Sequence, residues 1–373
     1  MIYLDHAALT PVLPQVLEAM VGAARDSWGN PSSRHAAGRR ARSRLEQARS
    51  DVAALFGSAP AEVAFAASGS RALERALGIA TQARPGPLVL SRLEHPSLLR
   101  LAAREAVQGR DVRYLSAPRG DVELESVRSV LEGAAVVSLS ALNHELGTAL
   151  PLARLREPLR DAVLVVDAVQ AAPWLDLAQL RDPSTPLVCA SQKLGGPPGA
   201  AALVVPRELS GREPLVDDDA GFLSVVGFGE ACARARTERA ARLERAVERA
   251  RTLLRGLERM GAEVVVNGAD ALRAGPIVNL SFPKIHGADL AAALDLKGVC
   301  IARGSACLRV GPEGSPVVRA AYPDEPWRAV SATRWSLGFD TTSAEIERAV
   351  AVLGTVLPKL PRRVPWPDEK GRP

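Results

Sequence analysis

The chain has 373 residues, and its 47% hydrophobic content can build a substantial core, although only 4% of the residues are aromatic. The net charge of +5 comes mostly from arginines spread along predicted helices, which favours a solvated basic surface and argues against a nucleic-acid site. The chain shows no signal-peptide pattern, no apolar run of about 18 residues, no CxxC pair and no metal-ligand spacing, so we expect a cytoplasmic protein with reduced thiols, no membrane span and no metal.

The first half of the chain alternates predicted helices and strands. Leucines and valines recur at helical spacing over 36–56 before Gly57, which predicts a helix that ends there. A second helix is predicted at 72–83. Short, nearly continuous apolar runs predict buried strands at 63–66, 88–90, 135–139, 162–166 and 200–205. This alternation predicts an α/β fold with a mostly parallel sheet flanked by helices.

The second half begins with a long predicted helix, from about 230 to 260, that is rich in Arg, Glu, Ala and Leu. After it we predict strands at 263–266, 277–282 and 299–301, with a helix at 289–294 between the last two. This pattern is typical of a smaller α+β domain. The tail from Pro358 is rich in proline and charge, and we expect it to be flexible.

Three polar segments occur in an order that suits a pyridoxal phosphate enzyme. Asp167 ends an apolar strand, where ligands bind in open α/β sheets, and could partner a pyridinium nitrogen. Lys193 follows 26 residues later among small residues and glycines, where an amine can carry a Schiff base. Ser68-Gly69-Ser70 lies between a strand and a helix and suits a phosphate. Taken alone, Asp167 is more typical of an ordinary strand end and Lys193 of an ordinary surface lysine, but the ordered set favours the cofactor.

One cysteine, Cys307, lies in a loop of small residues, Arg303-Gly304-Ser305-Ala306-Cys307. Cys189 and Cys300 lie in apolar runs instead, as structural cysteines do. The loop alone leaves open whether Cys307 is reactive or structural.

These segments, taken in order, resemble the cysteine desulfurases, in the class V aminotransferase branch of fold-type I pyridoxal phosphate enzymes. The resemblance runs from residue 2 to about 355. Its motifs are Tyr3-Leu4-Asp5-His6-Ala7-Ala8, Gly29-Asn30-Pro31-Ser32-Ser33-Arg34-His35, Glu94-His95-Pro96, Asn143-His144-Glu145-Leu146-Gly147-Thr148, Asp167-Ala168-Val169-Gln170, Lys193, Gly304-Ser305-Ala306-Cys307 and Arg334-Trp335-Ser336-Leu337-Gly338.

The resemblance implies a role for each matched residue. Lys193, His95 and Cys307 would be catalytic, with His95 stacked on the cofactor ring and moving protons, and Cys307 attacking the substrate sulfur as a thiolate. The residues implied to hold pyridoxal 5'-phosphate are Gly69, Ser70, His95, Asn143, Asp167, Gln170, Ser191, Gln192 and Lys193. Asn143 and Arg334 would bind the substrate, and Arg334 would bind the substrate carboxylate.

The implied reaction converts L-cysteine to L-alanine and leaves a persulfide on Cys307 for a sulfur-acceptor protein. The implied assembly is a homodimer. Residues 13–250 would form the large cofactor-binding domain, and 1–12 with 251–357 the small domain, followed by a flexible tail at 358–373. The acceptor stays open between iron–sulfur cluster assembly, tRNA thiolation and another pathway.

The chain departs from the family pattern where the cofactor phosphate is held. Ala190-Ser191-Gln192-Lys193 replaces the usual Ser-x-His-Lys, and the family's cross-subunit segment Gln-Glu-x-x-x-Arg-x-Gly-Thr is absent from 212–229. Asp217 to Asp219 cannot bind phosphate, so we expect weaker cofactor retention than is usual in the family. His6 and His144 each replace a family asparagine, which we interpret as exchanges of one polar residue for another.

We considered three alternatives to an active desulfurase. A related pyridoxal phosphate enzyme, such as a selenocysteine lyase or an aminotransferase, stays open, although Cys307 and its loop argue against the aminotransferase. A catalytically degenerate member that acts as an interaction protein also stays open, because the phosphate contacts have drifted. A nicotinamide-dependent oxidoreductase is excluded because no strand–GxGxxG–helix occurs.

Overall fold

The computed structural model describes residues 1–122, 124–150, 162–180, 184–211, 219–304 and 313–364, together with Leu159, Asp182 and Leu215. A seven-stranded sheet forms its centre, in the order β2-β8-β7-β6-β5-β3-β4. The strands are β2 (Val63–Ala66), β3 (Leu88–Ser91), β4 (Val112–Leu115), β5 (Val136–Ser140), β6 (Val163–Asp167), β7 (Leu187–Ala190) and β8 (Ala201–Val204). Only β8 runs antiparallel to its neighbours, so the predicted α/β fold with a mostly parallel sheet is confirmed.

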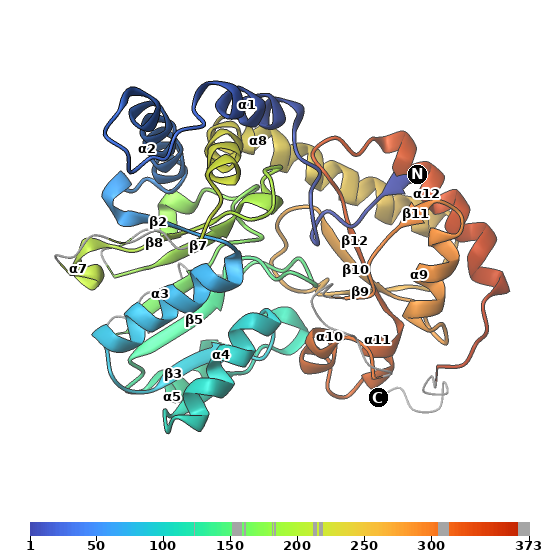
Figure 1. Cartoon of the computed structure of the whole chain (residues 1–373). Coiled ribbons are helices and arrows are strands. Elements are labelled where there is room, and N and C mark those ends of the chain that lie inside the picture. Colours follow the sequence, from blue (N-terminus) through green and yellow to red (C-terminus); the bar gives the residue numbers. More distant parts are fainter. Residues whose placement is uncertain are drawn as a thin grey trace.

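Helices cover both faces of this sheet, because its buried strands alternate apolar side chains between two cores (Figure 1). Strand β3 illustrates this: Val89 faces one core, whereas Leu88 and Leu90 face the other. The helices of the first half are α1 (Pro14–Asp26), α2 (Ala36–Phe56), α3 (Gly69–Ala83), α4 (Pro96–Val107), α5 (Leu124–Leu131) and α7 (Arg207–Ser210). Helices α3 and α4 pack on one face, and α2 and α5 on the other with the start of α8 (Phe222–Arg259).

The remaining elements lie on the other side of the molecule, beyond the carboxyl ends of the parallel strands (Figure 1). An antiparallel sheet of order β12-β10-β9 and a two-stranded parallel pair β1-β11 pack against helices and the second half of α8. The elements are β1 (Ile2–Tyr3), β9 (Val265–Asn267), β10 (Ile277–Ser281), α9 (Gly287–Asp295), β11 (Val299–Cys300), α10 (Pro316–Ala321), α11 (Pro326–Ser331), β12 (Ala332–Ser336) and α12 (Ser343–Val356). The N-terminal residues of β1 therefore pack with elements from the C-terminal part of the chain.

Helix α8 begins at Phe222, well before the predicted start near 230. The early turns contain Gly227 and Gly229, which the sequence pattern does not favour in a helix. The structure explains both, because a Cβ on Gly229 would lie 2.5 Å from the Cα of Ala48 on α2, and one on Gly227 would lie 2.8 Å from the sulfur of Met20 on α1. These glycines let three helices approach closely.

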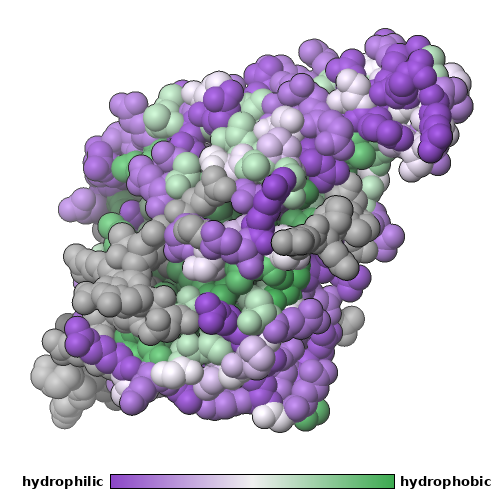
Figure 2. Space-filling view, turned by 90° about the vertical axis from the view of Figure 1, so that its left-hand side faces the viewer, coloured by the Kyte–Doolittle hydropathy of each residue, from purple (hydrophilic) through white to green (hydrophobic). Residues whose placement is uncertain are grey.

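Most other predicted elements appear within two or three residues of their expected bounds. The elements that the sequence analysis did not assign include α1, α4, β4, β7, β12 and α12. Figure 2 shows one face of the molecule on which hydrophilic residues predominate and hydrophobic ones gather near the middle. Within the described residues, no helix combines the length and the apolar character needed to cross a membrane.

Candidate active site

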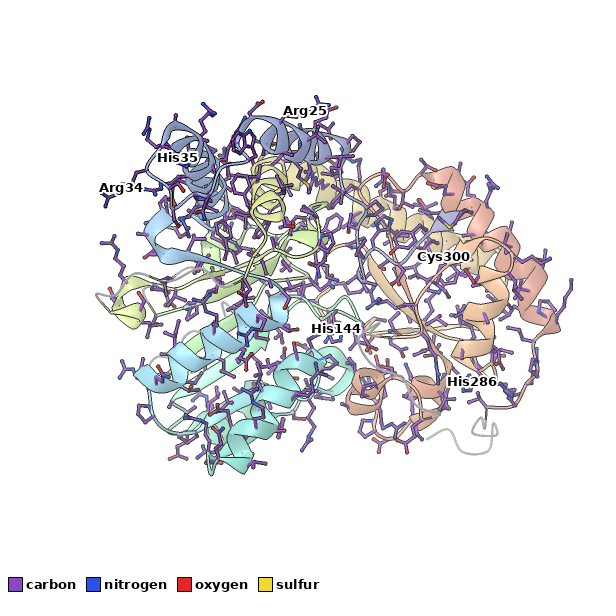
Figure 3. All side chains as sticks on the ribbon, in the orientation of Figure 1. Arg25, Arg34, His35, His144, His286 and Cys300 are labelled. Carbon is purple, nitrogen blue, oxygen red and sulfur yellow. The ribbon has the colours of Figure 1, made fainter. Side chains whose placement is uncertain are left out.

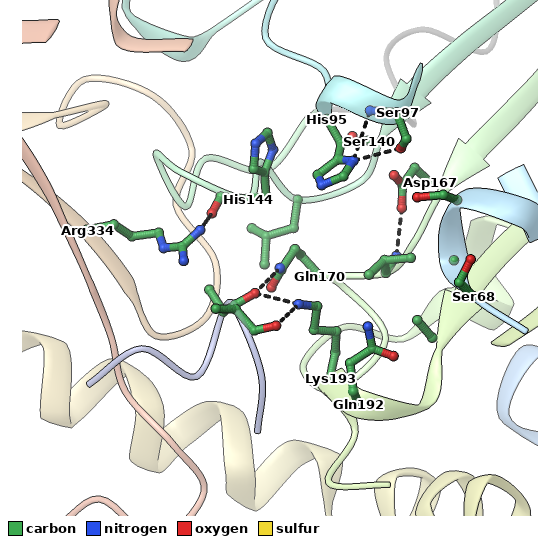
Figure 4. A pocket seen from close by; sticks show the side chains of 17 residues that line it. Ser68, His95, Ser97, Ser140, His144, Asp167, Gln170, Gln192, Lys193 and Arg334 are labelled. Carbon is green, nitrogen blue, oxygen red and sulfur yellow. Dashed lines mark hydrogen bonds between the residues drawn. The ribbon is translucent and has the colours of Figure 1, made fainter. Parts of the chain in front are cut away.

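A cavity of about 290 Å³ opens at the carboxyl ends of β3, β5, β6 and β7 (Figure 4). Its wall comes from the segments that follow these strands, from the start of α3, from Ala7 and Ala8 near the N-terminus, and from Arg334 on β12. Segments that are far apart in the sequence therefore meet where open α/β sheets bind ligands.

Lys193 lies in the cavity wall, in a short 3-10 turn directly after β7. Its Nζ donates hydrogen bonds to the carbonyl oxygens of Ala7, at 2.7 Å, and Ala8, at 2.5 Å. The side-chain amide of Gln170 donates to the same Ala7 oxygen at 2.8 Å. These contacts tie the N-terminal segment to the cavity and keep the amine inside it.

Asp167 is the last residue of β6 and lies in the same wall. Its Oδ1 accepts the backbone N–H of Val169 at 3.0 Å. Burial raises the pKa of this carboxyl to about 6, while Val169 and Lys193 act in the opposite direction. A buried carboxylate of this kind gains most from a cationic N–H donor placed in the cavity.

His95 caps the N-terminus of α4 and lines the cavity beside Ser97. Its Nδ1 accepts the backbone N–H of Ser97 at 3.2 Å and lies 2.7 Å from the Ser97 hydroxyl. Because a backbone N–H can only donate, Nδ1 carries no proton and the neutral ring holds its proton on Nε2. Burial, followed by Lys193, Arg100 and Arg334, lowers the pKa of His95 to about 4, so the ring is neutral at pH 7.

Glu94, the neighbour of His95, is buried behind the cavity wall. Its Oε2 accepts hydrogen bonds from the backbone N–H of Ser140, at 2.9 Å, and from the Ser140 hydroxyl, which lines the cavity. Burial, together with the nearby Asp167, raises the pKa of Glu94 to about 8, while the hydrogen bonds from Ser140 act in the opposite direction. Glu94 is therefore largely protonated at neutral pH, which avoids a second buried negative charge beside Asp167.

The turn after β5 directs His144, and not Asn143, at the cavity. The Asn143 Oδ1 accepts the backbone N–H groups of Glu145 and Leu146, at 2.9 and 2.8 Å, and its amide donates to the Leu93 carbonyl at 2.8 Å. The Asn143 side chain thus holds the turn together and is not part of the cavity wall. His144 lies in that wall between Arg334 and His95 (Figure 4), with its ring edge-on to that of His95 at 5.1 Å between centroids.

Arg334 reaches the cavity from β12, at the edge of the second sheet that faces the N-terminal segment. One terminal nitrogen donates to the His144 carbonyl at 3.0 Å and the other to Asp5 Oδ1 at 2.7 Å, whereas Nε is buried without a hydrogen-bond partner among the described residues. The guanidinium is therefore fixed in place and keeps donor capacity for a ligand.

The end of the cavity nearest α3 can accept an anion. Ser68, Gly69 and Ser70 line it at the start of a 15-residue helix, whose first N–H groups have no partner within the helix. Gln192 lies in the same wall, but the Ser191 hydroxyl is buried outside it and has no hydrogen-bond partner in the described part. Of the expected phosphate contacts, the structure thus brings together Gly69, Ser70 and Gln192.

Cys307 of the expected site, with its neighbours at 305–312, lies outside the described residues. So do Asp217 and Asp218, which belong to the acidic run that was expected not to bind phosphate. Sequence reasoning did not assign Ser97, Ser140, Glu94 or Asp5 to the site. Ser97 and Glu94 flank His95 in the sequence, so that motif held a usable signal, whereas Asp5 is brought to Arg334 by tertiary structure alone.

The comparisons with known proteins agree with this geometry. The family model described as aminotransferase class V matches residues 2–216 and 221–349. The chain belongs to this family. Its relatives include proteins named cysteine desulfurase, from Trichormus azollae, 30% identical over 99% of this chain and 96% of the relative, and from Rattus norvegicus, 31% identical over 94% and 81%. A protein from Bacillus subtilis named putative cysteine desulfurase IscS 1 is 30% identical over 96% of this chain and 99% of its own length.

Solved structures confirm the fold. A NifS-like protein superposes with a TM-score of 0.85 at 24% identity, covering 96% of this chain and all of that one. The apo structure of the cysteine desulfurase from Thermococcus onnurineus NA1 gives a TM-score of 0.83 at 21% identity and covers 96% and 95%. The predicted resemblance to the cysteine desulfurases is thus confirmed.

Pyridoxal phosphate, the cofactor that this family implies, fits the residues present. The cavity combines an amine on Lys193, a buried carboxyl on Asp167 for the ring nitrogen, and a helix start at Gly69 and Ser70 for the phosphate. The flat imidazole of His95 lies near Asp167, with His144 between it and Arg334 (Figure 4). The aldehyde, the ring nitrogen and the phosphate of the cofactor would therefore each meet a group of matching chemistry.

Proposed function

We propose that this protein is a pyridoxal-phosphate-dependent cysteine desulfurase, which converts L-cysteine to L-alanine and transfers the sulfur to an acceptor as a persulfide on Cys307. The observation that carries the proposal is the meeting of Lys193, Asp167, His95 and Arg334 in one cavity. Relatives named cysteine desulfurase, matched over almost the whole chain, support it.

Bound at Lys193, pyridoxal phosphate supplies an electron sink for bond cleavage at the substrate Cα. Asp167 holds the proton on the ring nitrogen that this sink requires, and its buried position favours such a pairing. Arg334, fixed by Asp5 and by the His144 carbonyl, orients the substrate by its carboxylate. The Lys193 amine, held at the cavity wall, is placed to take the proton from Cα.

His95 supplies a proton in this scheme. Its Nδ1 accepts the backbone N–H of Ser97, so the proton that His95 can give to the substrate is the one on Nε2. Its neutral state at pH 7 follows from burial and the neighbouring cations. We assign to His95 the protonation of the carbon that the sulfur leaves.

The transfer of sulfur from the substrate needs only one thiol, that of Cys307, to balance in atoms and electrons. The substrate Cβ–S bond breaks and an S–S bond forms between that sulfur and the Cys307 thiolate, so L-cysteine and one thiol give L-alanine and one persulfide. Cys307 lies outside the described residues, and its role comes from the resemblance. No external oxidant is needed because the carbon is reduced as the sulfur is oxidised.

The test is the visible absorption spectrum of the protein with added pyridoxal phosphate, before and after L-cysteine, followed by assays of alanine and persulfide. We expect a cofactor band that changes on adding cysteine, and equimolar alanine and sulfur. Lys193→Ala should abolish the covalent band, and Cys307→Ser should keep the spectral change but lose the persulfide. The matched control Lys284→Ala, at a lysine outside the cavity wall, should behave as wild type.

Other outcomes would replace the proposal. Turnover of selenocysteine without turnover of cysteine would identify a selenocysteine lyase, and formation of a keto acid would identify an aminotransferase. A protein that binds no cofactor at any concentration would be an interaction protein. A cofactor affinity typical of the family would refute the expected weak retention.

We further propose that the protein works in the cytoplasm as a homodimer and passes sulfur to a separate acceptor protein. Three large hydrophobic side chains support the dimer, because Leu17 and Val21 on α1 and Trp28 just after it are exposed. They lie in the part of the molecule where Figure 3 labels Arg25, Arg34 and His35. Leu17 and Val21 lie one helical turn apart, so they expose apolar surface on the same side of α1, and a dimer contact there would cover it.

A further inference from the structure

His144 is the side chain of the cavity that the scheme above leaves without a role. It is only 4% exposed and neither of its ring nitrogens has a hydrogen-bond partner within the described chain. Oε1 of Glu145 lies 3.8 Å from Nε2, which is too far for a hydrogen bond. Leaving two buried polar atoms unpaired is costly, so a ligand that pairs with them binds favourably.

The position of His144 indicates which part of a ligand it meets. The residue lies between Arg334, which donates to its backbone carbonyl, and His95, whose ring it contacts edge-on (Figure 4). The Nε of Arg334 is also buried and unpartnered in the described part of the molecule. Two unsatisfied groups that can donate an N–H thus adjoin at one end of the cavity.

The charges around His144 favour an anion at this end. Burial, followed by His95, Arg334 and Lys193, lowers the pKa of His144 well below its usual value, so the ring is neutral and carries one N–H at pH 7. The two cations of the cavity wall, Arg334 and Lys193, both act on this ring. Of the nearby acids, Asp5 is already paired with Arg334, and Glu145, whose Oε1 lies 3.8 Å from His144 Nε2, accepts the Ser315 hydroxyl at its other oxygen.

We propose that His144 is a substrate-binding residue that donates a hydrogen bond to the α-carboxylate of the amino acid, beside Arg334. It takes the place in the cavity that the resemblance assigned to Asn143, whose amide is committed to the turn. This inference rests on the proposed function, because it takes an amino acid to be the ligand.

The test is a cycle that removes the imidazole and the carboxylate separately. Cofactor-loaded wild type and His144→Phe are each titrated with L-alanine and with ethylamine, which is alanine without its carboxylate, and binding is followed by the cofactor spectrum. Phenylalanine keeps a ring against His95 but no hydrogen bond. We expect His144→Phe to weaken L-alanine binding about tenfold or more and to leave ethylamine binding unchanged. His144→Asn, which keeps an amide donor, should restore part of the loss.

The control variant is His6→Asn. His6 also stands where the family has asparagine and is also buried, but it is not part of this cavity wall. His6→Asn should keep the wild-type ratio of the two affinities. If phenylalanine prevents folding, His144→Ala gives the same cycle.

Three results of these titrations would contradict the proposals. Equal weakening of both ligands would place His144 against the cofactor or the amino group and overturn the carboxylate contact. Unchanged L-alanine binding would overturn any substrate contact. A wild-type protein whose spectrum responds to neither ligand would refute the proposed function itself, which separates that failure from failure of the inference.

Discussion

In this site, burial determines the protonation state of a side chain more than the type of residue does. Glu94 and Asp167 are both acids, yet burial raises their pKa values to about 8 and about 6, and burial lowers the pKa values of His95 and His144 so that both rings are neutral. An aqueous side chain would show the opposite charge state in three of these four cases near pH 6. None of these shifts can be inferred from the residue's identity.

The raised pKa of Glu94 makes a prediction about stability and pH. The folded protein holds this proton up to about pH 8, whereas the unfolded chain releases it near the ordinary value of 4.5, so between these values the folded state binds more protons. The free energy of unfolding must therefore fall as the pH rises through that window, by as much as about 5 kcal/mol. Glu94→Gln should remove this loss, because a neutral amide still accepts the Ser140 hydrogen bonds.

The measurement is urea unfolding of the cofactor-free protein at pH 5, 7 and 9. The variant should gain stability over wild type steadily as the pH rises, while Glu208→Gln, at an exposed glutamate, should show no such trend. A difference between Glu94→Gln and wild type that is constant from pH 5 to pH 9 would contradict the prediction. Asp167, His95 and His144 are present in both proteins, so their titration largely cancels in the difference.

At the scale of elements, helix packing depends on small residues at the crossing points. Helix α8 could not be placed from Phe222 by pattern alone, since Gly227 and Gly229 lower its apparent helix propensity. Packing against α1 and α2 outweighs this cost. The helix length is thus a tertiary outcome, although the amphipathic pattern after residue 230 is plain in the sequence.

This packing predicts opposite effects for two glycine substitutions. In Gly229→Ala the new methyl group meets the α2 backbone at Ala48, which cannot move aside, so we expect a loss of about 1–3 kcal/mol despite the better helix propensity. In Gly78→Ala, on α3, a Cβ meets nothing within 4 Å, so we expect a gain of up to about 1 kcal/mol. Thermal or urea unfolding of both variants checks this, and a Gly229→Ala protein as stable as Gly78→Ala would refute the packing argument.

The division into two domains stays a prediction, for which the cores give partial support. One core joins Ile2 and Leu4 to Leu253 and to residues of β10, β12 and α12, as residues 1–12 with 251–357 would require. Helices α10 and α11, however, contribute to the core of the large sheet. We propose that the small domain is anchored to the large one through these two helices.

At the scale of the whole molecule, the exposed hydrophobic side chains around α1 predict the oligomeric state. Trp28 is 72% exposed, so Trp28→Arg should cost the isolated chain little but place a charge in the proposed interface. We expect this variant to shift from dimer to monomer, as measured by light scattering after size exclusion. The control is Leu296→Arg, because Leu296 is 85% exposed on the other part of the molecule. A monomeric wild type, or a Trp28→Arg protein that remains fully dimeric, would contradict this placement.

The order of the chemical groups along the chain, and a mostly parallel sheet, could be predicted from the sequence. Asp167 follows an apolar run that predicts a strand, so its place at the ligand-binding edge of the sheet follows from the pattern. The strand before Lys193, β7, was not predicted, so only the structure places Lys193 at the same edge. Which side chain of the 143–147 turn faces the cavity depends on long-range contacts. The Asn143 amide donates to the Leu93 carbonyl, 50 residues away, and Arg334, 190 residues away, donates to the His144 carbonyl, so the His144 ring is the one that lines the cavity.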